Sequence, residues 1–230
     1  NFAVVANEAE APSTGDNGGP GSLSVIALSG FDPATPGLLS VTQIALPSQS
    51  GTPGFSAGRF DDIGRLPIDN APGTLEPESV AFSPDSQFAY ITLQENNGVV
   101  RLDLANSTLA FFGLGQTSHL ADLTNGGGYN PVEVLTAFRE PDGIAVIEIG
   151  GVRYFVTADE GDTRPSAGSA GVRGGRTMSV FDANTGALIS DTAGQLDDIA
   201  AARGVYPDSR SNRGGSEPEV LDAIVFNGRA

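Results

Sequence analysis

Carboxylates gather where two short apolar segments end, and their density is the first sign of chemistry in the sequence. They are Asp159, Glu160 and Asp162 after one segment, and Glu8 and Glu10 after the other. Carboxylate oxygens are the ligands that Ca²⁺ prefers in proteins, so these residues are candidate metal ligands. The alternative is that they are solvated loop acids, because no complete calcium-loop spacing is present.

A glycine-rich stretch directly after the second group holds three arginines, Arg164, Arg173 and Arg176. Arginine binds phosphate through two parallel hydrogen bonds, and Ca²⁺ beside such arginines would make a phosphoesterase site. The alternative is ion pairing within the protein, since the chain has 12 basic residues against 28 acidic ones. Both interpretations remain open at this point.

Composition excludes several other kinds of chemistry. The chain has no cysteine and one histidine, His119, which rules out disulfides, thiolate catalysis, cysteine-ligated zinc and a multi-histidine metal centre. A net charge of −16 opposes binding to nucleic acid. No apolar run approaches the length of about eighteen residues that a transmembrane helix needs. No residue is assigned a catalytic role, and the sequence leaves open whether the protein is an enzyme.

The elements that position these residues are short apolar segments bounded by turn residues. Examples are Phe88–Leu93, Val99–Leu104 and Ile144–Ile149, and the chain is rich in glycine (31) and proline (15). This pattern is typical of β-strands and predicts an all-β fold. One helix is predicted over Gln195–Arg203, with Leu196, Ile199 and Ala200 on its apolar face.

An internal repeat orders the predicted strands. The dipeptide Glu-Pro opens a strand at Glu76, Glu140 and Glu217, and Glu95 and Glu160 close the strand that follows the first two. The repeat divides the chain into units at about 1–46, 74–115 and 138–190, and a further unit begins near 217. These units predict a β-propeller, as one domain or part of one, with four-stranded antiparallel blades and long loops at one rim. One of those loops is expected at Gln116–Arg139.

The recurring glutamates Glu76, Glu95, Glu140 and Glu217 have two interpretations. They could line a central channel and bind cations, or they could hydrogen-bond free backbone N–H groups of the neighbouring blade. We assign them the second, structural role. About three and a half units are countable, against four to eight in a closed propeller. Either the chain is a segment of a larger propeller of about seven blades, or another polypeptide completes the ring, and we favour the first.

One unit carries a recognisable signature. The stretch Val80–Leu104, with Ser83-Pro84-Asp85 at its hairpin, resembles the blade of YVTN-type bacterial β-propellers, although Ser86 stands where that hairpin usually has glycine. The chain as a whole resembles the choice-of-anchor I family. The segments that carry this resemblance are Val5–Glu10, Leu93–Asn97, Glu140–Ala145 and Val156–Arg164.

The resemblance implies a bacterial protein that is secreted, periplasmic or attached to the cell surface. Some family members are described as alkaline-phosphatase-like or phytase-like. We therefore expect a binding, scaffold or assembly module that contacts a protein or a glycan through its loop-bearing rim, with self-assembly as a further option. The alternative is a Ca²⁺-dependent phosphoesterase, in which Ca²⁺ would be the cofactor.

Overall fold

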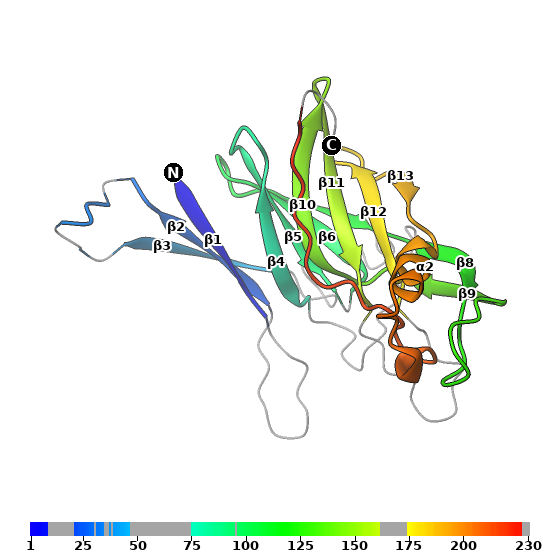
Figure 1. Cartoon of the computed structure of the whole chain (residues 1–230). Helices are drawn as coiled ribbons and strands as arrows, with labels where there is room; N and C mark the ends of the chain where they lie inside the picture. Colours follow the sequence, from blue (N-terminus) through cyan, green and yellow to red (C-terminus); the bar gives the residue numbers. More distant parts are fainter. Residues whose placement is uncertain are drawn as a thin grey trace, which may run out of the picture.

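The computed structural model describes residues 1–8, 21–29, 31–34, 37, 39–46, 75–94, 96–161 and 174–226. These residues form a mostly β structure of several antiparallel sheets, with one α-helix near the carboxyl end of the described chain (Figure 1). None of the helices in these ranges is long and apolar enough to cross a membrane.

Three sheets follow one another along the chain. Sheet I contains β1 (Phe2–Asn7), β2 (Ser22–Ala27) and β3 (Ser40–Ala45). Sheet II contains β4 (Pro77–Phe82), β5 (Phe88–Leu93), β6 (Gly98–Asp103) and β7 (Leu109–Gly113). Sheet III contains β10 (Pro141–Ile149), β11 (Val152–Asp159), β12 (Thr177–Asp182) and β13 (Leu188–Asp191). Each strand pairs antiparallel with the next, so every sheet is a meander.

The three sheets stack face to face in chain order, and sheet II lies between the other two. One face of sheet II, with Ile91 and Val100, packs against sheet I around Leu23. Its other face carries Tyr90, whose ring lies 5.9 Å from that of Phe155 in sheet III. Alternation of side chains along each strand puts apolar residues on both faces of sheet II, so burial on both sides stabilises the stack.

The Ser83-Pro84-Asp85 hairpin forms as the sequence predicts, without its usual glycine. Ser86 adopts the left-handed backbone conformation, with φ of 56°, that glycine enters most readily. The Asp85 carboxylate accepts hydrogen bonds from the Ser83 hydroxyl at 2.6 Å and from the Gln87 N–H at 3.1 Å. These bonds hold the turn in the conformation that glycine would otherwise provide.

The prediction of a loop over Gln116–Arg139 is wrong. This stretch contains a β-hairpin of β8 (Gln116–Ala121) and β9 (Glu133–Phe138), which pair only with each other among the described strands. The inward-facing residues of β8 are Thr117, His119 and Ala121. Because two of these three side chains are polar, the strand lacks the apolar alternation by which half-buried strands are recognised.

The predicted helix exists as α2 (Gln195–Ala202), and its one buried residue is Asp197, which does not belong to the predicted apolar face. Ile199 is 51% exposed, whereas Asp197 is buried. The reason is electrostatic, because Asp197 lies 3.3 Å from the buried guanidinium of Arg176. A short 3-10 turn, η1 (Asp208–Arg210), follows the helix.

Strand pairing gives the repeat a register that differs by one residue from the alignment on glutamates. Three strands, β1 in sheet I, β5 in sheet II and β11 in sheet III, end with the pairs Asn7–Ser22, Leu93–Gly98 and Asp159–Thr177. The residues that follow, Glu8, Gln94 and Glu160, are therefore equivalent. A slip of one residue turns a side chain to the other face of a strand. The counterpart of Glu160 in sheet II is thus Gln94; Glu95 lies outside the described residues.

Candidate functional site

The two ends of the sheet stack differ in their connections. At one end the strands are joined by short turns, such as Gly150–Gly151 between β10 and β11. At the other end the described connections include the β8–β9 hairpin, between sheets II and III, and the α2–η1 region that follows sheet III (Figure 1). We call this second end the acidic end. Its polar side chains include Gln94, Asp142, Glu160, Glu217 and Glu219, together with Arg210.

A direct contact joins equivalent positions of neighbouring sheets at the acidic end. The side-chain amide of Gln94 donates a hydrogen bond of 3.0 Å to Oε2 of Glu160. Each residue directly follows the second strand of its sheet. The repeat therefore places the two side chains side by side, although they are 66 residues apart in sequence.

The Glu160 carboxylate lies among other acidic groups. Burial raises its pKa to about 7; the bond from Gln94 opposes this shift, and Asp142, Glu219 and Glu217 raise the pKa further. Burial and Glu219 also raise the pKa of Asp142. Arg210 forms an ion pair with Glu217. Removing a proton from Glu160 therefore concentrates negative charge at a half-buried position, which favours the approach of a cation.

Glycine and the third Glu-Pro dipeptide bring Glu217 and Glu219 to this surface. A side chain at Gly143 in β10 would place its Cβ only 2.5 Å from the backbone oxygen of Glu219, so the close approach requires glycine. Glu140 and Glu217 share a left-handed backbone, with φ of 50° and 43°. The segment after Glu217 therefore begins as β10 does and lies along it.

Asp159 is adjacent to Glu160 in sequence, but its side chain points into the protein. It is fully buried and accepts hydrogen bonds from the hydroxyls of Thr157 at 2.6 Å, Thr177 at 2.5 Å and Ser179 at 2.5 Å. Burial raises its pKa to about 6, against the lowering effect of these bonds and of Arg139. Because alternate residues of a strand face opposite sides, the fold separates the two carboxylates that the sequence placed in one group.

Arg139 is the main buried cation beside Asp159, and no motif in the sequence marks it. Its Nε donates to Ser179 at 2.9 Å and lies 3.9 Å from Asp159, and its Nη2 donates to Asp191 at 2.5 Å. Its position directly before Glu140-Pro141 is the only signal in the sequence. The arginine supplies the positive charge that a buried carboxylate requires.

Arg176, a predicted phosphate ligand, is also fully buried. Its guanidinium lies 3.3 Å from Asp197 and donates to the backbone oxygens of Ser211 at 2.6 Å and Asp122 at 3.1 Å. These contacts tie sheet III to α2 and to the β8–β9 hairpin. The other two predicted phosphate ligands, Arg164 and Arg173, lie outside the described residues.

The predicted Ca²⁺ ligands are only partly within the described chain. Glu8 is exposed at the end of β1, and Asp162 and Glu10 lie outside the described ranges. Among the residues that the structure does describe, no group of three or more acidic or histidine side chains is arranged to hold a metal ion. The calcium site therefore stays a prediction that depends on Asp162 and Glu10.

Asparagines hold the backbone at two of the recurring Glu-Pro dipeptides. Oδ1 of Asn97 accepts hydrogen bonds from the N–H groups of Arg139 and Glu140, both at 3.0 Å. Oδ1 of Asn96 accepts the N–H of Glu76 at 3.0 Å. Asn97 thus links sheet II to the start of sheet III. Its side chain accepts hydrogen bonds from backbone N–H groups of a neighbouring sheet, which is the role that the sequence analysis predicted for the recurring glutamates.

Comparison with known proteins gives one family. The sequence pattern of the choice-of-anchor I domain matches residues 1–173. The chain belongs to the choice-of-anchor I family. No curated protein sequence matches it. Among solved structures, hydrazine synthase of Kuenenia stuttgartiensis is 15% identical, with a TM-score of 0.25. The alignment covers 75% of this chain and 43% of that one, and at this TM-score the likeness carries no argument.

The choice-of-anchor I match covers only part of the acidic end. It includes Gln94, Asp142 and Glu160, which belong to sheets II and III or directly follow their strands. Glu217 and Glu219 lie beyond residue 173, as does α2. Both the matched and the unmatched parts of the chain therefore contribute carboxylates to the same surface.

Proposed function

We propose that this choice-of-anchor I chain is part of a β-propeller in which sheets I, II and III are consecutive blades. Two of them are four-stranded meanders, and each packs its apolar face against the next sheet in the chain. Propeller blades are four-stranded antiparallel sheets of this kind. The family resemblance supports a bacterial protein that is secreted, periplasmic or attached to the cell surface.

We further propose that the protein is a binding module, and that its acidic end binds a basic segment of a partner protein. The observation that carries this proposal is that three other carboxylates lie near the half-buried Glu160, whose pKa is raised to about 7 by burial and, in addition, by these carboxylates. A guanidinium or ammonium group placed there would relieve the repulsion and would form charge-assisted hydrogen bonds. The net charge of −16 would steer a basic partner toward the protein.

A labelled oligo-arginine peptide tests the proposal by fluorescence anisotropy, with the wild type and Glu160→Gln compared at pH 8. Glu160→Gln removes one negative charge from the acidic end, and we expect affinity to fall about tenfold, or about 1.4 kcal/mol. The matched control is Glu148→Gln, because Glu148 lies at the opposite end of β10 and its loss changes the net charge equally. We expect the control to change affinity less than about twofold.

Equal weakening by both substitutions would show that the peptide responds to net charge alone, and the proposed site would be wrong. Two further arms address the other predicted functions. If the protein binds an uncharged glycan and Glu160→Gln leaves that binding intact, the partner is a glycan rather than a basic protein segment. If the protein releases phosphate from p-nitrophenyl phosphate and this requires Ca²⁺ and Asp162, the protein is a phosphoesterase rather than a binding module.

A further inference from the structure

The loop between β8 and β9, residues 122–132, lies against the α2–η1 region (Figure 1). Gly128 donates its N–H to Oδ2 of Asp208 at 3.1 Å, and the Tyr129 hydroxyl donates to Oδ1 of Asp198 at 2.8 Å. The sequence at 125–128 is Asn-Gly-Gly-Gly, and these residues are all exposed. The loop is therefore held in place while its asparagine and glycines stay open to water.

An asparagine that precedes a glycine can react with the backbone of its own chain. The glycine nitrogen attacks the carbonyl carbon of the asparagine side chain, and ammonia leaves as a cyclic imide forms. Water then opens the imide at either carbonyl group and produces aspartate or isoaspartate. Glycine favours the attack because it has no Cβ to crowd the nitrogen and because its backbone is the most flexible.

Three features of the structure favour this reaction at Asn125. Gly126 has a φ of 80°, which glycine adopts readily, and a Cβ added there would meet no atom within 4 Å. Within the described chain, no acceptor binds the Gly126 N–H, so the attacking nitrogen is free. The backbone N–H of Asn212 donates to Oδ1 of Asn125 at 2.9 Å, and Oδ1 is the oxygen that gains negative charge during the attack.

We propose that Asn125 is a site of spontaneous deamidation, with Gly126 as the nucleophile and water as the second reactant. A base removes the proton of the Gly126 N–H, and the nitrogen forms a bond to Cγ of Asn125. The bond from Cγ to the amide nitrogen then breaks, and this nitrogen takes up a proton and leaves as ammonia. Addition of water to the imide gives a carboxylate, so the chain gains one negative charge beyond its −16. This modification requires neither the proposed propeller nor the proposed binding function.

The same dipeptide at Asn97-Gly98 is protected by the fold. Asn97 is fully buried. Its Oδ1 accepts the N–H groups of Arg139 and Glu140, and its Nδ2 donates to the backbone oxygen of Gly115 at 3.0 Å. Gly98 begins β6, which pairs with β5 and β7 on its two sides. Attack would require these bonds to break, so Asn97 should react only when this part of the protein opens. The remaining Asn-Gly dipeptides, at 17–18 and 227–228, lie outside the described residues.

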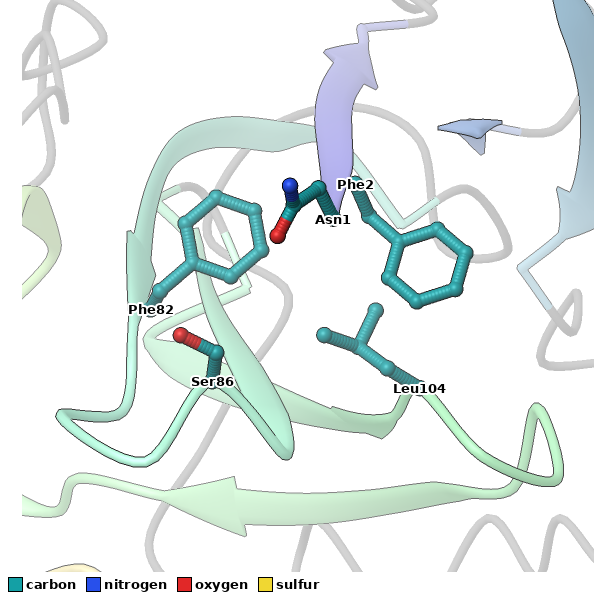
Figure 2. Close-up of a pocket in the computed structure, with 5 residues that line it drawn as sticks. All are labelled: Asn1, Phe2, Phe82, Ser86 and Leu104. Carbon is teal, nitrogen blue, oxygen red and sulfur yellow. The ribbon is translucent and has the colours of Figure 1, made fainter. Parts of the chain in front are cut away.

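Exposure of an asparagine is not enough without a glycine after it. Asn1 is exposed, but Phe2 follows it in the sequence. Both residues line a hollow of about 380 Å³, together with Phe82, Ser86 and Leu104 (Figure 2). The side chain of Phe2 crowds the backbone nitrogen that would have to attack. Asn1 is therefore an exposed asparagine that should stay intact.

The two products of deamidation should affect the loop differently. Aspartate at position 125 keeps the backbone and an oxygen that can accept the N–H of Asn212. In isoaspartate the main chain runs through the former side chain and is longer by one carbon, so the contacts with Asn212 and Asp208 lose their geometry. We therefore expect isoaspartate, but not Asn125→Asp, to loosen the contact between the β8–β9 loop and the α2–η1 region.

The first experiment incubates the folded protein at pH 8 and follows deamidation at each asparagine by peptide mapping with mass spectrometry. We expect Asn125 to react at least about tenfold faster than Asn97, because Asn97 must first be exposed by local opening. In urea the unfolded chain loses this protection, and the two rates should agree within about threefold. Asn1 should stay intact in both states. Equal rates at Asn125 and Asn97 in the folded protein, or an equally large difference in urea, would overturn the proposal.

The second experiment tests the nucleophile and the effect on the loop. Gly126→Ala should slow the reaction at Asn125 several-fold and leave Asn97 unchanged, because the added Cβ crowds the attacking nitrogen. Hydrogen exchange of the Asn212 N–H should be faster in the purified isoaspartate form than in fresh protein, and Asn125→Asp should leave it unchanged. An unchanged reaction rate in Gly126→Ala would contradict the assigned nucleophile. Unchanged exchange in the isoaspartate form would contradict the effect on the loop.

Discussion

Sheets II and III fill one position of the repeat in opposite ways. Leu93 ends β5 and packs in an apolar cluster with Leu23 and Val100. Its equivalent in sheet III, Asp159, is equally buried and accepts three hydroxyl hydrogen bonds beside Arg139. The paired strands differ to match, because Gly98 and Val100 of β6 correspond to Thr177 and Ser179 of β12.

In sheet I the equivalent position is occupied by Asn7, a polar residue without charge. The Asn7 amide donates to the hydroxyls of Ser22 at 3.2 Å and Ser24 at 2.9 Å. The strand positions match those of Asp159 with Thr177 and Ser179, but the hydrogen bonds run in the opposite direction and involve no charge. This position therefore accepts an apolar, a neutral polar or a charged residue, provided that the strand paired with it (β6, β2 or β12) supplies matching partners. A buried charge also requires a counter-ion, and Arg139 provides it only in sheet III.

The largest expected effect comes from Arg139→Leu, which leaves Asp159 buried without its cation. We expect the free energy of unfolding to fall by about 3–5 kcal/mol at pH 8. At pH 5 the loss should be smaller, because an unpaired Asp159, whose pKa is already raised to about 6, takes up a proton and becomes neutral. Urea unfolding followed by circular dichroism measures both values. Equal losses at the two pH values would contradict the role given to Asp159.

Leu93→Ala tests the apolar version of the same position. Truncating a fully buried leucine should cost about 2–5 kcal/mol, through lost burial and the cavity that remains. No titrating group depends on this side chain, so the same unfolding experiment should give equal losses at pH 5 and pH 8. A loss that changed with pH would mean that the two positions do not differ as described.

Glu160→Gln should have a smaller effect of the opposite sign. The folded protein raises the pKa of Glu160 from 4.5 to about 7, so it binds the proton more tightly than the unfolded chain does. Stability therefore falls as pH rises from about 4.5 to 7, and the substitution removes this loss. Because water screens a half-exposed group, we expect a gain of about 1 kcal/mol at pH 8 and none at pH 4. An equal gain at pH 4 and pH 8 would contradict this origin of the effect.

Asp85→Asn is expected to have the smallest effect. It removes the ion pair with Arg153, at 2.5 Å, on the rim opposite the acidic end, but leaves an oxygen to accept the turn hydrogen bonds. Exposed ion pairs contribute about 0.2–1 kcal/mol, and salt weakens them. Thermal unfolding at low and high salt measures this contribution. A loss above about 2 kcal/mol would place this surface pair on the same level as the buried one.

The features that depend on local sequence pattern, namely strands, a hairpin and a helix, were predicted correctly. The short apolar segments, the Ser83-Pro84-Asp85 hairpin and the helix predicted over Gln195–Arg203, which is α2 (Gln195–Ala202), all appear in the structure. The β8–β9 hairpin was missed because two of the three buried residues of β8, Thr117 and His119, are polar. Gln94 was missed because the equivalence of strands depends on hairpin length, and β10 and β11 are longer than β4 and β5.

The ion pairs between residues far apart in the sequence could not be predicted from local sequence patterns. Arg139 and Asp191 are 52 residues apart, and Arg176 and Asp197 meet only because α2 folds back toward β12. Asp159 and Glu160 were grouped as neighbours, although strand alternation sends their side chains to different environments. Register and long-range packing decide these contacts.

The most direct test of the proposed binding surface is an NMR titration of the Glu160 carboxyl carbon, without and with the oligo-arginine peptide. We expect a pKa of about 7 in the free protein, because burial and the nearby carboxylates disfavour the charged form. We also expect the bound peptide to lower this pKa, since a cation beside the carboxylate favours ionisation. A pKa near the usual 4.5 in the free protein, or one that the peptide leaves unchanged, would contradict the proposal.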